Sequence, residues 1–379
     1  MSNTLKFGNG QWATKEGSTL AYNDENNNFK PLPFNFERGS SATVVNKDGL
    51  IETVGSGEPR IDYKDDSKGA LKLEPTRSNL VTYSEDFSDS YWYKSGTYTI
   101  TNNYGISPDG TNNSTRIQGD ANTVVYRDVG SSTDARSIYV KATSGSGSIQ
   151  LLSHNNNTNN VFAIDENWKR VEINSASVLG DNFYVVDFRG ASTDVFDIEI
   201  YGAQLEAGSY PTSYIPTQGS VVTRLADSCS QTPPNSVIGQ TEGSIYAEFK
   251  SLDNVSNLIL WMRNPSGGNY GDMIKLECDG DNRMRLEVRE SNVTSANLTS
   301  DVLPTNIYYK VAVAYKQNDF VLYLNGVQIS VDTSGNVPTC SEMYVGKYID
   351  AGIRMGVSKD LKLYNTRLSN SELAALTQV

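Results

Sequence analysis

The side chains that could hold a sugar gather at 261–270 of the chain. Trp261 and Arg263 share one strand parity, and their apolar neighbours have the other, so both should face the same side of a sheet. Tyr270 follows in the glycine-rich loop PSGGNYGD. Ligand sites combine aromatic surface with a few placed polar groups. The pattern predicts a ligand-binding platform of Trp261, Arg263 and Tyr270, with one alternative left open: Trp261 lies in the core.

Carboxylates cluster at Glu277, Asp279 and Asp281, around the expected hairpin tip DGDN. Asp and Asn at such a tip are typical of a solvated turn. A calcium site made by Asp279 and Asp281 with backbone carbonyls is the alternative. Hydrolysis of a glycoside needs two carboxylates facing each other across a cleft, about 5 to 9.5 Å apart. No such pair is evident, so we predict no catalytic residues and no enzyme.

Other residue types that carry chemistry are scarce. The single histidine, His154, lies in the polar tract HNNNTNN, which suits neither a metal site nor a catalytic triad. The cysteines Cys229, Cys278 and Cys340 are too scattered for a disulfide framework or a zinc site. Cys278 shares the parity of apolar strand positions and should be buried. We therefore predict no metal ligands and no cofactor.

The composition predicts an all-β protein. The 379 residues include 31 Gly and 22 Tyr, and Asn, Ser and Thr are frequent, which favours short strands and turns over long helices. This length suggests two or three domains. The net charge of −12 argues against nucleic acid or an anionic membrane as partner. The chain has neither a long apolar run nor an apolar signal region, so we expect synthesis in a cytoplasm and no membrane insertion.

Turn signals divide the chain into four expected parts. Residues 1–80 read as an attachment arm and connector, 81–217 as a β-sandwich, 218–240 as a linker with Pro233-Pro234, and 241–379 as a second sandwich. The pair Asn325-Gly326 predicts a type I′ hairpin. Near the end, Ser369 and Glu372 have the spacing of a capping box, which predicts a short helix. The predicted architecture is therefore an attachment region followed by two tandem antiparallel sandwiches (jelly rolls) and a short C-terminal helix.

The segment 34–87 carries many fixed phrases. They are an R-x-S-x-A-T segment, D-G-L-I-E, P-R-I-D-Y, L-x-L-E-P-x-R-x-N-L and Y-S-E-D-F, at 38–44, 48–52, 59–63, 71–80 and 83–87. This segment resembles one near the start of many tailed-bacteriophage virion proteins. The resemblance implies a protein of the virion surface, assembled in the host cytoplasm, that contacts other virion proteins through its N-terminal region. It also implies a homotrimer. The segment itself should be a connector that packs on a neighbouring domain or subunit.

Two further resemblances cover the expected sandwiches. W-x-K-S-G at 92–96, S-I-Y-V-K-A at 137–142 and the closing phrase YGAQLEAGSYPTSYIPT at 201–217 resemble carbohydrate-binding-module jelly rolls of phage structural proteins. YYKVAVAYKQNDFVLYLNGVQI and LKLYNTRLSNSELAAL resemble laminin-G/concanavalin-like sandwiches, a fold that hosts lectins, enzymes and inert modules. The E-x-D-x-x-E pattern usual in concanavalin-like hydrolases is absent. The expected function is a fibre or adhesin that binds host-surface or environmental glycans. The alternatives are a ligand-free capsid or tail decoration protein and, less favoured, a glycan depolymerase.

Overall fold

The computed structural model describes residues 5–12, 14–15, 19–23, 29–129, 134–153, 160–176, 182–231, 238–251, 256–348, 352–353 and 356–379. They form two compact units. Unit 1 combines residues 1–47, 54–76 and 225–379, and unit 2 combines 48–53 and 77–224. The structure is almost entirely β, which confirms the predicted fold class. No described helix is long and apolar enough to cross a membrane.

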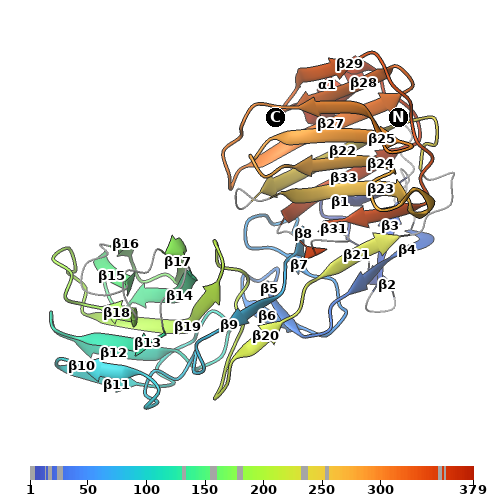
Figure 1. The fold of residues 1–379 in the computed structure, drawn as a ribbon. Helices are drawn as coiled ribbons and strands as arrows, with labels where there is room; N and C mark the ends of the chain where they lie inside the picture. Colours follow the sequence, from blue (N-terminus) through green and yellow to red (C-terminus); the bar gives the residue numbers. More distant parts are fainter. Residues whose placement is uncertain are drawn as a thin grey trace. The chain divides into compact units, whose positions relative to one another are not determined.

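Unit 1 contains a nine-stranded and an eight-stranded antiparallel sheet (Figure 1). The first has the order β2 (Thr14–Lys15), β3 (Thr19–Asn23), β4 (Phe29–Glu37), β21 (Ser228–Gln231), β30 (Glu342–Val345), β23 (Asn257–Asn264), β24 (Asp272–Cys278), β25 (Met284–Glu290) and β26 (Val293–Thr299). The second has the order β29 (Val327–Asp332), β28 (Asp319–Leu324), β27 (Tyr308–Lys316), β22 (Glu242–Ser251), β33 (Gly356–Tyr364), β8 (Ala70–Leu73) and β7 (Ile61–Asp62), and β1 (Leu5–Gly8) also pairs with β33. Small elements complete the unit: β5 (Ala42–Val45), the pair β31 (Lys347–Tyr348) and β32 (Gly352–Ile353), the 3₁₀ turn η1 (Pro265–Gly267) and α1 (Asn370–Thr377).

One apolar core joins these two sheets. Alternate residues of β23 and β24, such as Leu260, Met262 and Ile274, are buried with Ile245 of β22 and Val313 of β27 in a single cluster. This period of two is what a sheet with one covered face requires. The predicted local signals hold here. Asn325 and Gly326 both have positive φ (48° and 85°), and Ser369 and Glu372 form the capping box of α1. Cys278 is buried, as predicted.

The N-terminal residues belong to this core, which differs from the expected arm and connector. Figure 1 shows the N-terminal strands, in blue, beside the C-terminal ones: β1 pairs with β33, so that Phe7 lies opposite Leu361, and β4 pairs with β21. Phe7, Phe34 and Phe36 are buried in the cluster. Phe34 and Phe36 alternate with exposed Asn35 and Glu37, but so short a pattern does not reveal the distant segments with which these strands pair. Likewise, the expected linker 218–240 contains β21 and the strand β20 (Val222–Arg224).

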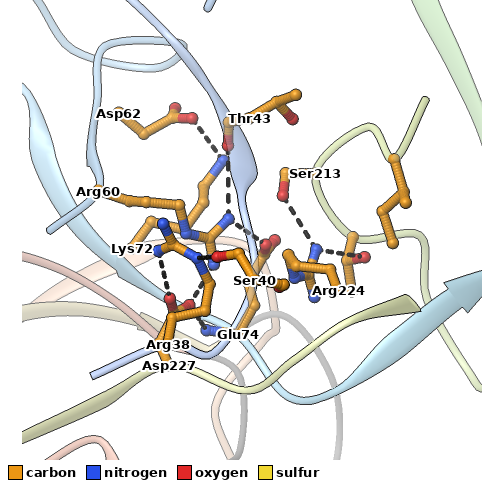
Figure 2. A network of polar contacts seen from close by, with 12 residues as sticks. Arg38, Ser40, Thr43, Arg60, Asp62, Lys72, Glu74, Ser213, Arg224 and Asp227 are labelled. Atoms are coloured by element: carbon orange, nitrogen blue, oxygen red, sulfur yellow. Dashed lines mark hydrogen bonds and ion pairs between the residues drawn. The ribbon is translucent and has the colours of Figure 1, made fainter. Parts of the chain in front are cut away.

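A buried ion cluster joins the parts of the segment 34–87 that belong to unit 1. Arg60 Nη1 lies 2.6 Å from Glu74 Oε2, Arg60 also pairs with Asp227, and Arg38 Nη1 lies 3.0 Å from Asp227 Oδ1 (Figure 2). All four side chains are shielded from solvent. Burial alone would lower the pKa of Arg60, but Glu74 and Asp227 outweigh it and raise the pKa. Arg38, Arg60 and Glu74 belong to the phrases of the segment 34–87. Charge pairing within this unit explains these residue types, a folding requirement that the sequence alone did not reveal.

Unit 2 contains two five-stranded antiparallel sheets (Figure 1). One has the order β10 (Tyr93–Ser95), β13 (Val124–Asp128), β18 (Asn182–Asp187), β15 (Gly147–Ser153) and β16 (Val161–Ile164); the other has the order β11 (Tyr98–Thr101), β12 (Thr115–Gly119), β19 (Asp197–Ala207), β14 (Asp134–Ala142) and β17 (Lys169–Ala176). Their inner faces share one apolar cluster that includes Trp92, Val125, Val140 and Phe183. This arrangement agrees with the sandwich expected at 81–217.

The chain enters and leaves unit 2 through a pair of adjacent strands. β9 (Arg77–Asn79) pairs antiparallel with β20 (Val222–Arg224). Asn79 is buried, and its side-chain amide donates to the carbonyl oxygens of Ala203 and Ile215. Arg224 donates to Thr212 and Ser213. The remaining strand, β6 (Ile51–Val54), lies where the chain passes between the two units in sequence, and Ile51 donates its N–H to the carbonyl of Pro108.

Candidate functional site

The structure brings together all three residues of the predicted platform, in unit 1. Trp261 and Arg263 lie on β23, on the face of the nine-stranded sheet opposite the apolar core, as their parity predicted. Tyr270 lies in the loop between β23 and β24, and its ring stacks on that of Trp261, with centroids 5.5 Å apart and planes 16° from parallel. Pairing of β23 with β30 places Tyr344 opposite Trp261 in register, with ring centroids 5.9 Å apart.

Trp261 itself is not an exposed platform. Its exposed fraction is 0%, because Tyr270 covers one side, Tyr344 a second, and Leu258 and Met273 complete a small apolar cluster. Thus the idea that Trp261 presents its ring to a ligand is corrected: Trp261 supports the two tyrosines. This cluster is separate from the core between the sheets. The alternative that Trp261 lies in the core is therefore right that the ring is buried but wrong about where it is buried. Tyr270 and Tyr344 are half-buried and reach the surface.

Arg263 is 8% exposed and anchors the polar groups around these rings. Its Nε donates to Glu342 Oε2 at 2.9 Å and its Nη1 to Asn269 Oδ1 at 2.9 Å. The guanidinium carbon lies 5.6 Å from the centroid of the Trp261 ring and 5.8 Å from that of Tyr344. Tyr344 in turn donates its hydroxyl hydrogen to Glu342. The arginine therefore fixes the positions of side chains from β23, β30 and the loop at once.

The loop that carries Tyr270 has a backbone that only glycine permits at two points. Gly268 ends the turn η1 with φ 80° and ψ −173°. A Cβ on Gly271 would lie 2.0 Å from the carbonyl oxygen of Gly267, a distance that no side chain tolerates. At the start, Asn264 accepts a hydrogen bond from the N–H of Ser266. At the end, Asp272 accepts one from Ser291. These constraints hold Tyr270 over Trp261 without any contribution from a ligand.

Together these groups form a surface suited to a polyhydroxylated ligand. Tyr270 and Tyr344 supply aromatic edges and faces, while Asn269 and Glu342 supply a donor and acceptors at the surface. Positioned aromatic rings with a few polar groups are the usual lining of a ligand site. Sequence reasoning missed Tyr344, Glu342 and Asn269. The first two reach the site through strand pairing across about 80 positions, which no local pattern encodes; only Asn269, in the loop beside Tyr270, could have been found from the sequence.

The acidic cluster of Glu277, Asp279 and Asp281 is held by ion pairs and by hydrogen bonds of a turn. Lys275 Nζ lies 2.9 Å from both Glu277 Oε1 and Glu287 Oε2, and Arg285 also contacts Glu287. Asp279 accepts from the N–H groups of Asp281 and Arg283, which is the geometry of a turn. Within the described ranges, no group of three or more His, Cys, Asp or Glu side chains could hold a metal ion. Cys229, Cys278 and Cys340 are buried free thiols. His154 lies outside the described residues.

One known family resembles part of unit 1. Residues 226–374, less than half of the chain, match the model of the Concanavalin A-like lectin/glucanases superfamily. No curated protein matches the chain. The matched range contains β23, β24, β30 and the whole cluster around Trp261. This agrees with the laminin-G/concanavalin-like resemblance of the sequence.

Among solved structures, the chain is similar to the CBM40 of the Ruminococcus gnavus IT-sialidase, with 18% identity over 38% of this chain and 86% of that one and a TM-score of 0.34. It is also similar to the receptor binding domain of the botulinum neurotoxin C/D mosaic serotype, with 16% identity over 40% of each chain and a TM-score of 0.34. A third is the SAP-like pentraxin from Limulus polyphemus, with 10% identity over 36% of this chain and 70% of that one and a TM-score of 0.31.

Proposed function

We propose that the protein is a non-enzymatic glycan-binding protein whose unit 1 holds sugar at Tyr270 and Tyr344. The observation that carries this proposal is the ordered cluster on the outer sheet face, inside the range that matches the Concanavalin A-like lectin/glucanases superfamily. Two reachable aromatic rings stand beside Asn269 and Glu342, and Arg263 fixes both polar side chains from below. A single site of this size binds weakly, so several copies on one particle would act through avidity.

A glycan array with the full-length protein tests this proposal. We expect reproducible binding that is lost in Tyr270→Ala and Tyr344→Ala. The control is Tyr98→Ala, which removes an exposed tyrosine of unit 2 outside the site. Circular dichroism should show that all three variants remain folded. An array profile that both unit 1 substitutions leave unchanged, with no glycan lost, would contradict the assignment of the site.

We also propose that the protein is displayed on a phage virion, as a fibre or adhesin. The resemblance of the segment 34–87 to tailed-phage virion proteins supports this. Deletion of residues 1–80 is a poor test, because it removes β1, β4 and β8 from the sheets of unit 1. Antibody labelling of the intact protein on purified particles is better, and label restricted to the particle surface is the expected result. Light scattering of the purified chain tests the proposed homotrimer.

The second candidate is a decoration protein without a ligand. Here the tight stacking of Tyr270 on Trp261 is the relevant observation, because it orders the surface without any bound sugar. A blank array, together with particles that lose stability when the protein is omitted, would favour decoration. For the third candidate, a glycan depolymerase, a reducing-end assay on host polysaccharide should stay negative.

A further inference from the structure

We propose that unit 2 carries a second, independent binding site, a polar pocket that takes uncharged saccharides and excludes acidic ones. The pocket has a volume of about 350 Å³, within the range usual for small-ligand sites. It opens beside the sheet that contains β12 and β19. Its lining comes from four short segments: Tyr83, Glu85 and Asp86; Asn102 and Asn103; Asn113 and Thr115; and Pro216, Thr217 and Gln218.

Two of the sequence phrases meet at this pocket. Y-S-E-D-F supplies Tyr83, Glu85 and Asp86, and the closing phrase supplies Pro216 and Thr217. Ser84 connects the two phrases: its hydroxyl lies 2.7 Å from the Tyr214 hydroxyl and accepts the N–H of Thr217 at 2.8 Å. Residues about 130 positions apart are thereby held in one geometry. The phrases that carry the resemblance by sequence thus also build the cavity.

Glu85 is the lining residue from which a chain of hydrogen-bonded oxygens continues behind the pocket. Tyr214 donates to Glu85 Oε1 at 2.9 Å, and the Tyr201 hydroxyl lies 3.1 Å from the same oxygen and 3.0 Å from Asp109 Oδ2. One phenol hydrogen cannot serve two carboxylates. Burial raises the pKa of Glu85, and nearby Asp109 adds to this, although the two tyrosine hydroxyls act in the opposite direction. This end of the pocket therefore favours additional hydrogen-bond donors, which sugar hydroxyls provide.

The charges of the lining select against anions. Glu85 and Asp86 are both acidic, and no Lys or Arg is among the described lining residues. Asp86 is held by the side-chain amide of Asn102 at 2.8 Å and by the Ser88 hydroxyl at 2.6 Å. Burial alone would raise the pKa of Asp86, but these hydrogen bonds outweigh it and lower the pKa, so the group stays ionised. A carboxylate on a ligand would meet like charge at short range, which disfavours binding.

The pocket also separates a buried floor from an exposed rim. Thr115 and Thr217 are 1% and 5% exposed, whereas Asn102, Asn103 and Gln218 are exposed amides around the mouth. Tyr83 is half-buried and, with Pro216, supplies the apolar surface on which a sugar ring can pack. The carboxylates accept hydrogen bonds, the amides surround the mouth, and the Tyr83 ring forms one wall. This combination suits a neutral sugar better than a metal ion or a peptide.

The test uses the full-length protein and compares neutral sugars with acidic ones; glucose and glucuronate form the matched pair, because they differ only at C6. N-acetylglucosamine and glucose are compared with glucuronate and N-acetylneuraminate by NMR titration and on an array. We expect the neutral sugars to bind, and Tyr83→Ala and Asp86→Asn each to weaken that binding by about tenfold. Asp86→Asn should also reduce the discrimination against glucuronate. Asp128→Asn, an exposed carboxylate of β13 outside the pocket, is the matched control and should change nothing.

Failure of this inference can be told apart from failure of the unit 1 proposal. Tyr270→Ala should leave the unit 2 signals intact, and Tyr83→Ala should leave the unit 1 signals intact. The inference is overturned if glucuronate binds as well as glucose in the wild-type protein. It is also overturned if neither neutral sugar perturbs the resonances of Tyr83 and Gln218, or if folded Tyr83→Ala and Asp86→Asn both bind normally.

Discussion

The two units are both antiparallel sandwiches, yet their candidate sites differ in charge: one is close to neutral and the other is acidic. In unit 1, Arg263 lies beneath the aromatic surface and is matched by Glu342 and Asn269, so the site is close to neutral. In unit 2, Glu85 and Asp86 line the pocket, and no cation is among the described lining residues. If both sites bind sugars as proposed, the side chains placed on each sandwich, and not the fold, would determine which sugar is accepted.

The sites also differ in how they are built. The unit 1 cluster lies on the face of a sheet and depends on pairing between β23 and β30. The unit 2 pocket lies among loops whose phrases are joined by Ser84. A substitution in a strand should disturb the first site through register, whereas a substitution in a loop should disturb the second through local hydrogen bonds.

Asp227→Ala should selectively destabilise unit 1. It leaves Arg38 and Arg60 buried with less compensation, and breaking a buried ion pair typically costs about 3 to 5 kcal/mol. Each unit has its own core, so calorimetry should show one transition shifted to lower temperature and the other retained. Ser228→Ala, at the next position, is the control. A single transition that moves as a whole would show that the two units unfold together.

Trp261→Ala should separate stability from ligand contact within unit 1. The ring is fully buried beneath Tyr270 and Tyr344, and removing such a side chain typically costs about 3 to 5 kcal/mol. Denaturant unfolding measures this loss. Tyr270→Ala, by contrast, should lose array binding at a smaller cost in stability. Equal destabilisation by the two substitutions would contradict the supporting role assigned to Trp261.

Ser369→Ala should weaken the end of unit 1 by about 1 kcal/mol through loss of the helix cap. α1 packs on the outside of the eight-stranded sheet through Leu373, whereas the unit 1 site lies on the nine-stranded sheet. Sugar binding should therefore be unchanged in a titration at constant temperature. A change in binding to either unit would show that the helix is coupled to the sites.

The acid dependence of unit 1 should carry a small contribution from Asp62. Burial alone would raise the pKa of Asp62, but Lys72 and backbone N–H groups outweigh it and lower the pKa. The stabilisation is therefore present above the unfolded value of about 3.9 and is lost as the pH falls through the lower folded value. Asp62→Asn should flatten this part of the stability curve. If the stability of unit 1 falls with acid in the same way in this variant, the pairing of Asp62 with Lys72 is contradicted.

Many strands and turns can be predicted from local sequence, but the assignment of segments to the two units cannot. Strand positions such as β16 and β24 follow from alternation and turn signals, and the hairpin at Asn325-Gly326 from its dipeptide. The assignment of residues 1–47 to unit 1 does not, because β1 pairs with β33 more than 350 positions away. Short polar strands have no periodicity that could indicate such a partner. Their pairing depends on the completed sheet.

The candidate sites were predictable to different degrees. Strand parity placed Trp261 and Arg263 on the correct face, and the loop placed Tyr270 near them. Burial of Trp261 could not be foreseen, because Tyr344 reaches it only through the register of β30. In unit 2 the sequence alone gives the phrase Y-S-E-D-F no part in a binding site. Its carboxylates line a cavity only when the closing phrase, far along the chain, lies against it.

The order of the segments also determines how the protein responds to a protease. The chain passes between the units after residues 47, 53, 76 and 224, so four peptide segments link them. Cleavage of any one segment leaves the two units joined by the other three. Even the two parts of unit 1 on either side of a cut at residue 76 remain paired through β1 with β33 and β4 with β21. A nicked protein would therefore give two bands on a denaturing gel and still behave as one molecule in solution, with both sandwiches attached.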